Sequence, residues 1–422
     1  MKVKITPSNL SGTVRAPSSK SEAHRYLVCA ALADAPTDIV MHSPSDDVSA
    51  TADCLRALGA HIDRTCEGFH VVPVTEVKKK CLLLCRESGT TLRFMLPIAA
   101  SLSADADFSA EGRLPERPLE PLSSEMARHG ALVTRDGNII SCRGRLCGND
   151  FALRADISSQ FISGILLASP LLGGVTVRLD GTVESLDYIR MTLDVMRRFG
   201  IESSLSENII TVCSGGYRSP ETVSVSGDWS GCAFWICAGA ASRDGITCTG
   251  VDHGSAQGDR CIVDIVRSMG ADICASANSV TVKRGKLAAV DVEAADIPDI
   301  VPPIAALAAA ADGETHIRGA GRLRYKECDR LSAMRDIISS LGGSASEEAD
   351  GLTVCGGVIH GGEVSSHGDH RIAMSAAVLS VFADSPVTVD GAECVSKSYG
   401  AFWDDFESLG GVTDRIDSER ME

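Results

Sequence analysis

The segment Leu55-Arg56-Ala57-Leu58-Gly59-Ala60-His61-Ile62 decides the fold, because its pattern occurs six times along the chain. In each copy an amphipathic run ends in a glycine, and a β-like segment follows. The six glycines, at intervals of 71, 70, 70, 72 and 68 residues, are Gly59, Gly130, Gly200, Gly270, Gly342 and Gly410. A glycine in this place is typical of a helix C-terminus in the left-handed conformation. The interval predicts six copies of one repeat of about 70 residues.

A second set of positions recurs with the same period. Helix openings are predicted near Lys20, Ser88, Ser158, Trp229, Pro298 and Gly368, at intervals of 68, 70, 71, 69 and 70 residues. Short alternating segments, such as residues 68–74 and 208–213, follow the second helix of a repeat. Each repeat is therefore predicted to be a strand, a helix, a strand, a second helix and short strands. We predict an α/β protein.

Length and charge exclude several classes of function. The chain has 422 residues, enough for two or three domains, and its 40 Lys+Arg against 56 Asp+Glu give a net charge of −16. Nucleic acid and anionic membranes both require a basic face, so neither is expected as a partner. Residues 1–7 lack the apolar run of a signal peptide, and the longest apolar run, residues 300–311, is shorter than the about 20 residues of a membrane span. We expect a cytoplasmic protein whose anionic ligands, if any, meet local clusters of cations.

The sixteen cysteines do not predict a metal site. The chain has no CxxC motif, and no histidine cluster accompanies the closest pairs, which are Cys81/Cys85, Cys142/Cys147 and Cys232/Cys237. We expect the cysteines to be small buried apolar residues in a reducing compartment. The chain also lacks the glycine-rich loops GxxxxGK[ST] and GxGxxG that bind nucleotides, so we expect no cofactor.

The predicted helix openings are rich in hydroxyl, glycine and cationic residues. The clusters are residues 18–25 (SSKSEAHR), 87–93 (ESGTTLR), 158–161 (SSQF) and 368–371 (GDHR). Free N–H groups at a helix N-terminus bind anions, and Lys or Arg in the first turns adds full charge. Any one cluster also fits plain N-capping. Their recurrence at equivalent positions favours a shared site for a polyanion.

Other polar segments have two interpretations. The segments are residues 116–118 (ERP), 297–299 (IPD), 326–330 (KECDR) and 395–397 (VSK). Taken alone, residues 326–330 fit a solvated helix face with an i,i+3 pair between Glu327 and Arg330. Asp299 alone fits a first-turn acid that stabilises the helix dipole.

Nine segments, in order, resemble the 5-enolpyruvylshikimate-3-phosphate synthase family. They are SSKSEAHR, ESGTTLRFM, RLPERP, SSQF, SLDYIRMTL, IPD, RLRYKECDRL, GDHRIAM and SKSY, and they extend from Ser18 to Tyr399. The resemblance implies two similar domains of three repeats each around buried helices, an inside-out α/β barrel. Residues 1–18 and 226–422 would form one domain and residues 19–225 the other, with the active site in the cleft between them.

The resemblance also implies the reaction. The enolpyruvyl group of phosphoenolpyruvate would be transferred to the 5-hydroxyl of shikimate 3-phosphate, with release of phosphate. The reaction would be an addition–elimination through a tetrahedral intermediate, without a metal or a covalent enzyme intermediate. The family resemblance further suggests a monomer.

Individual residues receive roles from the same resemblance. The implied catalytic residues are Lys20, which would contact both substrates and assist proton transfer, Asp299, which would accept the 5-hydroxyl proton, and Glu327, which would help to protonate the methylene carbon. Those implied to bind shikimate 3-phosphate are Lys20, Ser21, Arg25, Ser158, Ser159, Gln160, Ser185, Asp299 and Lys326, with Tyr188 nearby. Those implied to bind phosphoenolpyruvate are Lys20, Gly89, Thr90, Arg117, Gln160, Arg330, Arg371 and Lys397. With Arg93, the cations among them would form a local exception to the negative charge of the chain.

Two alternative functions fit the sequence less well. The sister enolpyruvyl transferase that acts on UDP-N-acetylglucosamine normally has a reactive cysteine in a mobile loop, and residues 110–117 contain none. A non-catalytic anion-binding scaffold is disfavoured by the joint presence of Lys20, Asp299 and Glu327. The chain departs from many members at Glu87, which would place a carboxylate beside the phosphoenolpyruvate subsite.

Overall fold

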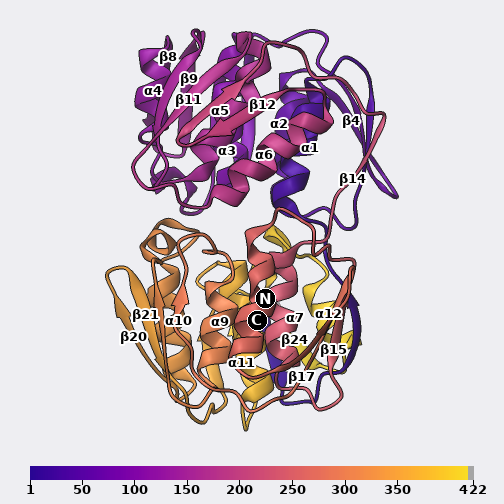
Figure 1. The fold of residues 1–422 in the computed structure, drawn as a ribbon, viewed down its shortest axis with the longest axis vertical. Helices are drawn as coiled ribbons and strands as arrows, with labels where there is room; N and C mark the ends of the chain where they lie inside the picture. Colours follow the sequence, from indigo (N-terminus) through magenta and orange to yellow (C-terminus); the bar gives the residue numbers. More distant parts are fainter. Residues whose placement is uncertain (417–422) are drawn as a thin grey trace, which may run out of the picture. The chain divides into compact units, whose positions relative to one another are not determined.

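The computed structural model describes residues 1–416 of the chain, and these residues form six four-stranded sheets. The chain divides into two compact units, which we call unit 1 (Met1–Pro17 with Ser226–Glu422) and unit 2 (Ser18–Val225). Each unit has its own hydrophobic core. Figure 1 shows helices packed beside the sheets in each unit, with α4 at the edge of unit 2.

All six sheets have the same topology. The first strand is parallel to the second, the third is antiparallel to the second, and the fourth is antiparallel to the third. This common topology is the structural form of the repeat that the glycine spacing predicts.

Unit 2 contains three of these sheets. In spatial order, the strands of the first are β14 (Thr222–Ser224), β3 (Thr37–Val40), β5 (Gly68–Val72) and β4 (His61–Thr65), with helices α1 (Lys20–Ala31) and α2 (Asp46–Leu58). The second is β6 (Lys80–Arg86), β7 (Asp105–Ala110), β9 (Ile139–Gly144) and β8 (Ala131–Asp136), with α3 (Gly89–Ser101), the 3₁₀ helix η1 (Leu114–Glu116) and α4 (Leu122–Arg128). The third is β10 (Asp150–Arg154), β11 (Val175–Asp180), β13 (Ile209–Val212) and β12 (Ser203–Ser206), with α5 (Ser159–Ala168), η2 (Ser169–Leu172) and α6 (Leu186–Arg198).

Unit 1 repeats this arrangement. Its first sheet is β2 (Gly12–Arg15), β15 (Ile246–Thr249), β17 (Ser279–Lys283) and β16 (Asp272–Ala275), with α7 (Trp229–Gly239), η3 (Gly258–Cys261) and α8 (Ile262–Ser268). The second is β18 (Val292–Glu293), β19 (Glu314–Arg318), β21 (Gly351–Cys355) and β20 (Ser344–Glu348), with α9 (Val301–Ala308), η4 (Gly321–Tyr325) and α10 (Arg330–Ser340). The third is β22 (Gly362–Ser365), β23 (Val387–Asp390), β1 (Lys2–Thr6) and β24 (Val412–Ile416), with α11 (His370–Phe382), η5 (Ala392–Lys397) and α12 (Phe402–Ser408).

The six predicted helix-ending glycines are confirmed. Each follows the second helix of a repeat, and all six have a positive φ, between 79° and 122°. Four of the predicted helix openings lie within one residue of the observed start, whereas two are displaced. Helix α9 begins at Val301 rather than near Pro298, and α11 begins at His370 rather than near Gly368.

The first helix of each repeat is buried, which confirms the predicted fold class. In unit 1, α7, α9 and α11 pack against one another, and in unit 2, α5 packs against α3 and α1. Small residues allow this close approach: a Cβ at Gly164 in α5 would lie 2.4 Å from the carbonyl oxygen of Arg93 in α3. Helices α5, α7 and α9 are almost wholly apolar, as expected for elements that water does not reach, whereas α1 and α3 also bury polar side chains such as Arg25 and Arg93.

Two further expectations concern membrane spans and cysteines. Among residues 1–416, no helix is long and apolar enough to cross a membrane. All sixteen cysteines are free thiols. The expectation of buried cysteines holds for nine of them, whereas four are exposed: Cys66, Cys147, Cys213 and Cys274. The exposed four lie in loops or on edge strands, where the pattern of the sequence does not indicate burial.

Candidate active site

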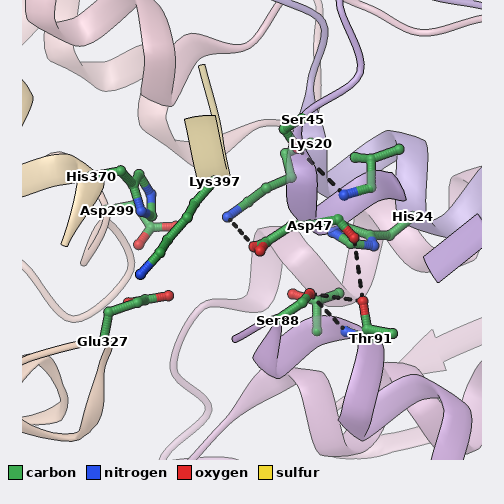
Figure 2. A network of polar contacts seen from close by, with 12 residues as sticks. Lys20, His24, Ser45, Asp47, Ser88, Thr91, Asp299, Glu327, His370 and Lys397 are labelled. Carbon is green, nitrogen blue, oxygen red and sulfur yellow. Dashed lines mark hydrogen bonds and ion pairs between the residues drawn. The ribbon is translucent and has the colours of Figure 1, made fainter. Parts of the chain in front are cut away.

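In unit 2, the first turn of α1 places a cation against a carboxylate. Ser19 caps the helix by accepting a hydrogen bond from the backbone of Glu22, and Lys20 is its first residue. Lys20 Nζ lies 3.0 Å from Oδ2 of Asp47, in the first turn of α2 (Figure 2). Both side chains are mostly buried, with exposed fractions of 14% and 11%. The lysine is therefore held in one position by a short, mostly desolvated ion pair.

Arg25, further along α1, is a buried cation that donates hydrogen bonds to neutral oxygens, while the carboxylate of Glu22 acts on it through its charge. Within residues 1–416 its guanidinium donates only to neutral oxygens: Ser21 O at 2.6 Å, Thr192 Oγ1 at 2.8 Å, and Ser163 Oγ and Tyr188 O, both at 3.2 Å. Burial lowers the pKa of Arg25 to about 10. A buried positive charge without a hydrogen-bonded carboxylate favours an anion, because the anion neutralises it.

The N-terminus of α3 lies under two arginines. A Cβ at Gly89 would be 2.8 Å from Nη1 of Arg117 and 3.1 Å from Nη1 of Arg93, so a larger residue here would have to displace the Arg117 guanidinium from its observed position. Gln160 joins the same group, since its amide donates to Thr90 Oγ1 at 2.7 Å and accepts from Arg93 at 2.6 Å. The positive end of a helix and two buried arginines thus meet at one place, as an anion site requires.

The serine clusters of unit 2 act as caps. Ser88 caps α3 and Ser158 caps α5, each by accepting from a backbone N–H two or three residues later. Ser185 precedes α6 with a left-handed φ of 55° and is 1% exposed. The interpretation of Ser88 and Ser158 as N-capping residues is therefore confirmed. Ser159 is also buried, in the first turn of α5.

In unit 1, a single arginine gathers three carboxylates. Arg330 is 1% exposed; it lies 3.0 Å from Asp299, 2.8 Å from Glu327 and 2.7 Å from Asp369. Burial opposes its charge, but the three carboxylates hold the pKa of Arg330 well above its usual value. The interpretation of residues 326–330 as a solvated face is therefore wrong for Arg330. Its pair with Glu327 exists, inside the protein rather than on its surface.

Asp299 is the centre of a second group of cations. Its carboxylate lies 3.2 Å from Nη2 of Arg371 and 3.7 Å from Nζ of Lys326, in addition to Arg330. Nη1 of Arg371 donates to the backbone oxygen of Asp299 at 2.9 Å. Helix α9 begins two residues after Asp299, so Asp299 does not lie in its first turn. The surroundings of the Asp299 carboxylate indicate ion pairing with these cations and not stabilisation of a helix dipole. Lys397 Nζ donates to Gly368 O at 2.7 Å.

Three acids in or near these groups have no role assigned from the sequence. Asp47 stands beside Asp46 after a capping serine, a pattern that indicates only a first-turn acid. Asp369 caps α11 as well as pairing with Arg330. Asp259 is buried and accepts a hydrogen bond from Ser230, and its spacing in the sequence carries no signal. Among residues 1–416, no group of His, Cys, Asp and Glu could hold a metal ion.

The chain was compared with known proteins. A sequence profile described as EPSP synthase (3-phosphoshikimate 1-carboxyvinyltransferase) matches residues 5–406. A 3-phosphoshikimate 1-carboxyvinyltransferase from Clostridium kluyveri is 38% identical over 98% of this chain and 98% of that protein. One from Clostridium botulinum is 39% identical over 97% of both. The chain belongs to the EPSP synthase family.

Solved structures agree with the fold of that family. EPSP synthase from Acinetobacter baumannii superposes with a TM-score of 0.80 at 24% identity and covers 98% of this chain and 100% of that chain. The enolpyruvyl transferase NikO from Streptomyces tendae gives 0.78 at 20% identity over 98% of both. The family and fold class predicted from the sequence are confirmed. Membership of the EPSP synthase family also confirms that the chain is an enzyme, a transferase, and disfavours a non-catalytic scaffold.

Proposed function

We propose that this enzyme transfers the enolpyruvyl group of phosphoenolpyruvate to the 5-hydroxyl of shikimate 3-phosphate and releases phosphate. Family membership supports the reaction, and one observation carries the assignment of its residues. Asp299 and Glu327, the two carboxylates expected to move protons, are held by the same buried guanidinium, that of Arg330. One arginine thus positions both groups.

Shikimate 3-phosphate binds mainly to unit 2 in this proposal. Its phosphate neutralises the charge of Arg25, whose hydrogen-bond acceptors within unit 2 are neutral oxygens. Ser21 and the serines at the N-terminus of α5 bind the same phosphate in this proposal. Ser158, Ser159 and Gln160 supply hydroxyl, amide and backbone N–H donors. Ser185 and Lys326 complete the proposed set.

Phosphoenolpyruvate binds where the arginines are densest. In unit 2 its anionic groups meet the N-terminus of α3 at Gly89 and Thr90, beneath Arg117. In unit 1 they meet Arg330, Arg371 and Lys397. Planar guanidinium groups suit carboxylate and phosphate because they donate two parallel hydrogen bonds. Both sets of residues act on the same pair of substrates in this proposal.

The proton transfers follow from these positions. Glu327 helps to deliver a proton to the methylene carbon of phosphoenolpyruvate, which leaves a cationic C2. The 5-hydroxyl oxygen bonds to C2 while Asp299 accepts its proton, and a tetrahedral intermediate results. Loss of a proton from the new methyl group and departure of phosphate then restore the double bond. Lys20, held by Asp47, contacts both substrates and assists the proton transfers.

A single assay tests the proposal. Phosphate release is measured with phosphoenolpyruvate plus shikimate 3-phosphate, and separately with UDP-N-acetylglucosamine in place of the shikimate. We expect release with the first pair only. Release only with the sugar nucleotide would point to the sister transferase, and release with neither would refute an enolpyruvyl transfer.

A further inference from the structure

A buried row of hydrogen bonds links three of the helices that begin at the proposed site of unit 2, namely α1, α2 and α3. His24 Nδ1 in α1 lies 2.6 Å from Thr51 Oγ1 in α2, and Thr51 Oγ1 lies 2.7 Å from Thr91 Oγ1 in α3. Thr91 Oγ1 donates to Ser88 Oγ at 2.7 Å (Figure 2). All four side chains are 0% exposed. None of the four has a role in the function proposed above.

The hydroxyl hydrogens fix the direction of this row. Each threonine has a single hydrogen to donate. Thr91 donates to Ser88, or to the carbonyl oxygen of Asp47 at 3.4 Å, so Thr51 must be the donor in its bond to Thr91. The hydrogen of Thr51 is then used, and His24 Nδ1 must donate to Thr51. The row of hydrogen bonds therefore begins with the Nδ1–H group of His24 and ends at Ser88, at the N-terminus of α3.

Two independent features of His24 agree with this direction. Its Nε2 is buried and has no hydrogen-bond partner among residues 1–416, so a hydrogen on that nitrogen would be stranded, whereas one on Nδ1 has an acceptor. Burial first, and then the charges of Lys20 and Arg25, hold the pKa of His24 well below its ordinary value. The ring is neutral and has only one N–H.

We propose that His24 is a positioning residue for the phosphoenolpyruvate subsite, which it serves by donating from Nδ1 into Thr51 and so joining α1, α2 and α3. These helices begin at or near Lys20, Asp47 and Gly89 respectively. Hydrogen bonds in a row strengthen one another where water is absent. These bonds therefore fix the positions of the N-termini of α1, α2 and α3 relative to one another. This inference rests on the function proposed above.

The first test removes one hydroxyl and keeps the shape of the side chain. Thr51→Val breaks the row of hydrogen bonds between α1 and α3, and we expect the KM for phosphoenolpyruvate to rise about five- to tenfold, the factor that one lost hydrogen bond corresponds to. The KM for shikimate 3-phosphate should rise less, since Arg25 on α1 is also held by Thr192 and Ser163, which lie outside the row of hydrogen bonds. Thr51→Ser retains the hydroxyl and should restore most of the affinity.

A matched variant separates positioning from stability. Thr37 is also 0% exposed, and its hydroxyl lies 2.8 Å from Ser219 Oγ, outside the proposed site. Thr37→Val should lower Tm about as much as Thr51→Val and leave both KM values unchanged. If the KM for phosphoenolpyruvate rises no more in Thr51→Val than in Thr37→Val, the inference is wrong.

A spectroscopic test does not depend on activity. In ¹⁵N correlation spectra the His24 ring should be the Nδ1–H tautomer, with a pKa well below that of an ordinary histidine. Thr51→Val removes the acceptor of the Nδ1–H group and should change this tautomer. An Nε2–H tautomer in the unaltered enzyme would overturn the inference. Lack of phosphate release by the unaltered enzyme would instead refute the proposed function, so the two failures are distinguishable.

Discussion

Two buried arginines, Arg330 and Arg25, have contrasting surroundings. Arg330 is surrounded by carboxylates, which its charge holds in place. Arg25 donates, within the described residues, to neutral oxygens, so its charge is available to an anionic substrate. In the proposed function Arg330 organises groups that move protons and also meets phosphoenolpyruvate, whereas Arg25 meets the phosphate of shikimate 3-phosphate.

At the residue scale, the two carboxylates held by Arg330 should be needed for turnover. We expect Glu327→Gln and Asp299→Ala each to lower kcat by at least about 10²-fold, because each removes a proton donor or acceptor. Glu347, which pairs with Arg324 and Arg335 away from this group, supplies the control, and Glu347→Gln should have nearly normal turnover. Phosphate release measures all three. Near-normal turnover in either site variant would refute the role of that residue.

Gly89 should be needed for affinity and not for stability. Gly89→Ala places a methyl group 2.8 Å from Nη1 of Arg117, so the guanidinium must move away from the N-terminus of α3. We expect the KM for phosphoenolpyruvate to rise about 10- to 100-fold, whereas Tm should stay equal or rise because alanine favours the helix. Gly216→Ala, where nothing lies within 4 Å, is the control. An unchanged KM would show that Arg117 does not bind this substrate from its observed position.

Asp259 should make stability depend on pH. Burial first, and then the charge of Asp299, raise the pKa of Asp259 to about 7, compared with about 3.9 in an unfolded chain. Its stabilising contribution is therefore complete below about pH 4 and is lost as pH rises through 7. Relative to Asp259→Asn, the unaltered enzyme should lose up to roughly 4 kcal/mol of unfolding free energy across that range.

Urea unfolding of both proteins at several pH values measures this difference. Asp136→Asn, at an exposed carboxylate on β8, corrects for changes in surface charge. A difference between Asp259→Asn and the unaltered enzyme that stays constant with pH would contradict the expectation.

The sequence predicts site residues where charge and family pattern coincide. Lys20, Asp299 and Glu327 each lie within segments that carry the family resemblance. The sequence does not reveal Asp47 or Asp259, because an acid near a helix start usually only stabilises the dipole. Their surroundings depend on packing between elements distant in the chain, which no local pattern encodes.

At the element scale, the accuracy of each boundary depends on its local chemistry. Glycines after amphipathic runs mark the ends of the second helices, because few other residues adopt a positive φ without strain. The start of α9 is harder to predict, since Pro302 and Pro303 lie within its first turn. Proline is tolerated there because the first N–H groups of a helix have no partner within it.

Two equivalent glycines should differ in their sensitivity to substitution. Gly200 has a φ of +79° and would bring a Cβ no closer than 3.5 Å to Arg218, so Gly200→Ala should cost about 1–2 kcal/mol from backbone strain. Gly270 has a φ of +100°, and its Cβ would lie 2.3 Å from the carbonyl oxygen of Lys286. Gly270→Ala should therefore cost more than Gly200→Ala. Chemical denaturation measures both, and equal costs would argue against the backbone contact.

At the scale of the whole molecule, the period predicts the number of repeats but not how the sheets are completed. Three sheets take a strand from outside their own repeat: β14 joins β3, β2 joins β15, and β1 lies between β23 and β24. These strands have three to five residues, too few for a periodic pattern to identify their partners. The net charge of −16 likewise does not predict the local clusters of cations, because these clusters contain a minority of the 40 basic residues.

Damage to β1 should affect one unit only. Ile5 on β1 is 0% exposed and pairs with Val387 and Thr413, within the core of unit 1. Ile5→Ala should cost about 2–4 kcal/mol, and hydrogen exchange should become faster in the strands and helices of residues 226–416. Lys4→Ala, at an exposed position of the same strand, is the control. Equal acceleration in residues 18–225 would contradict the independence of the two cores.

The position of β1 between β23 and β24 has a consequence during protein synthesis. Residues 18–225 leave the ribosome as one continuous stretch, so unit 2 can fold while the rest of the chain is still being translated. β1 is made before unit 2, whereas both of its partners are made after unit 2, and at about 5–20 residues per second β1 waits roughly 20–80 s for them. During that interval its apolar residues Val3 and Ile5 must remain soluble without a sheet. The nascent chain is therefore exposed to aggregation at β1 until both partner strands have been made.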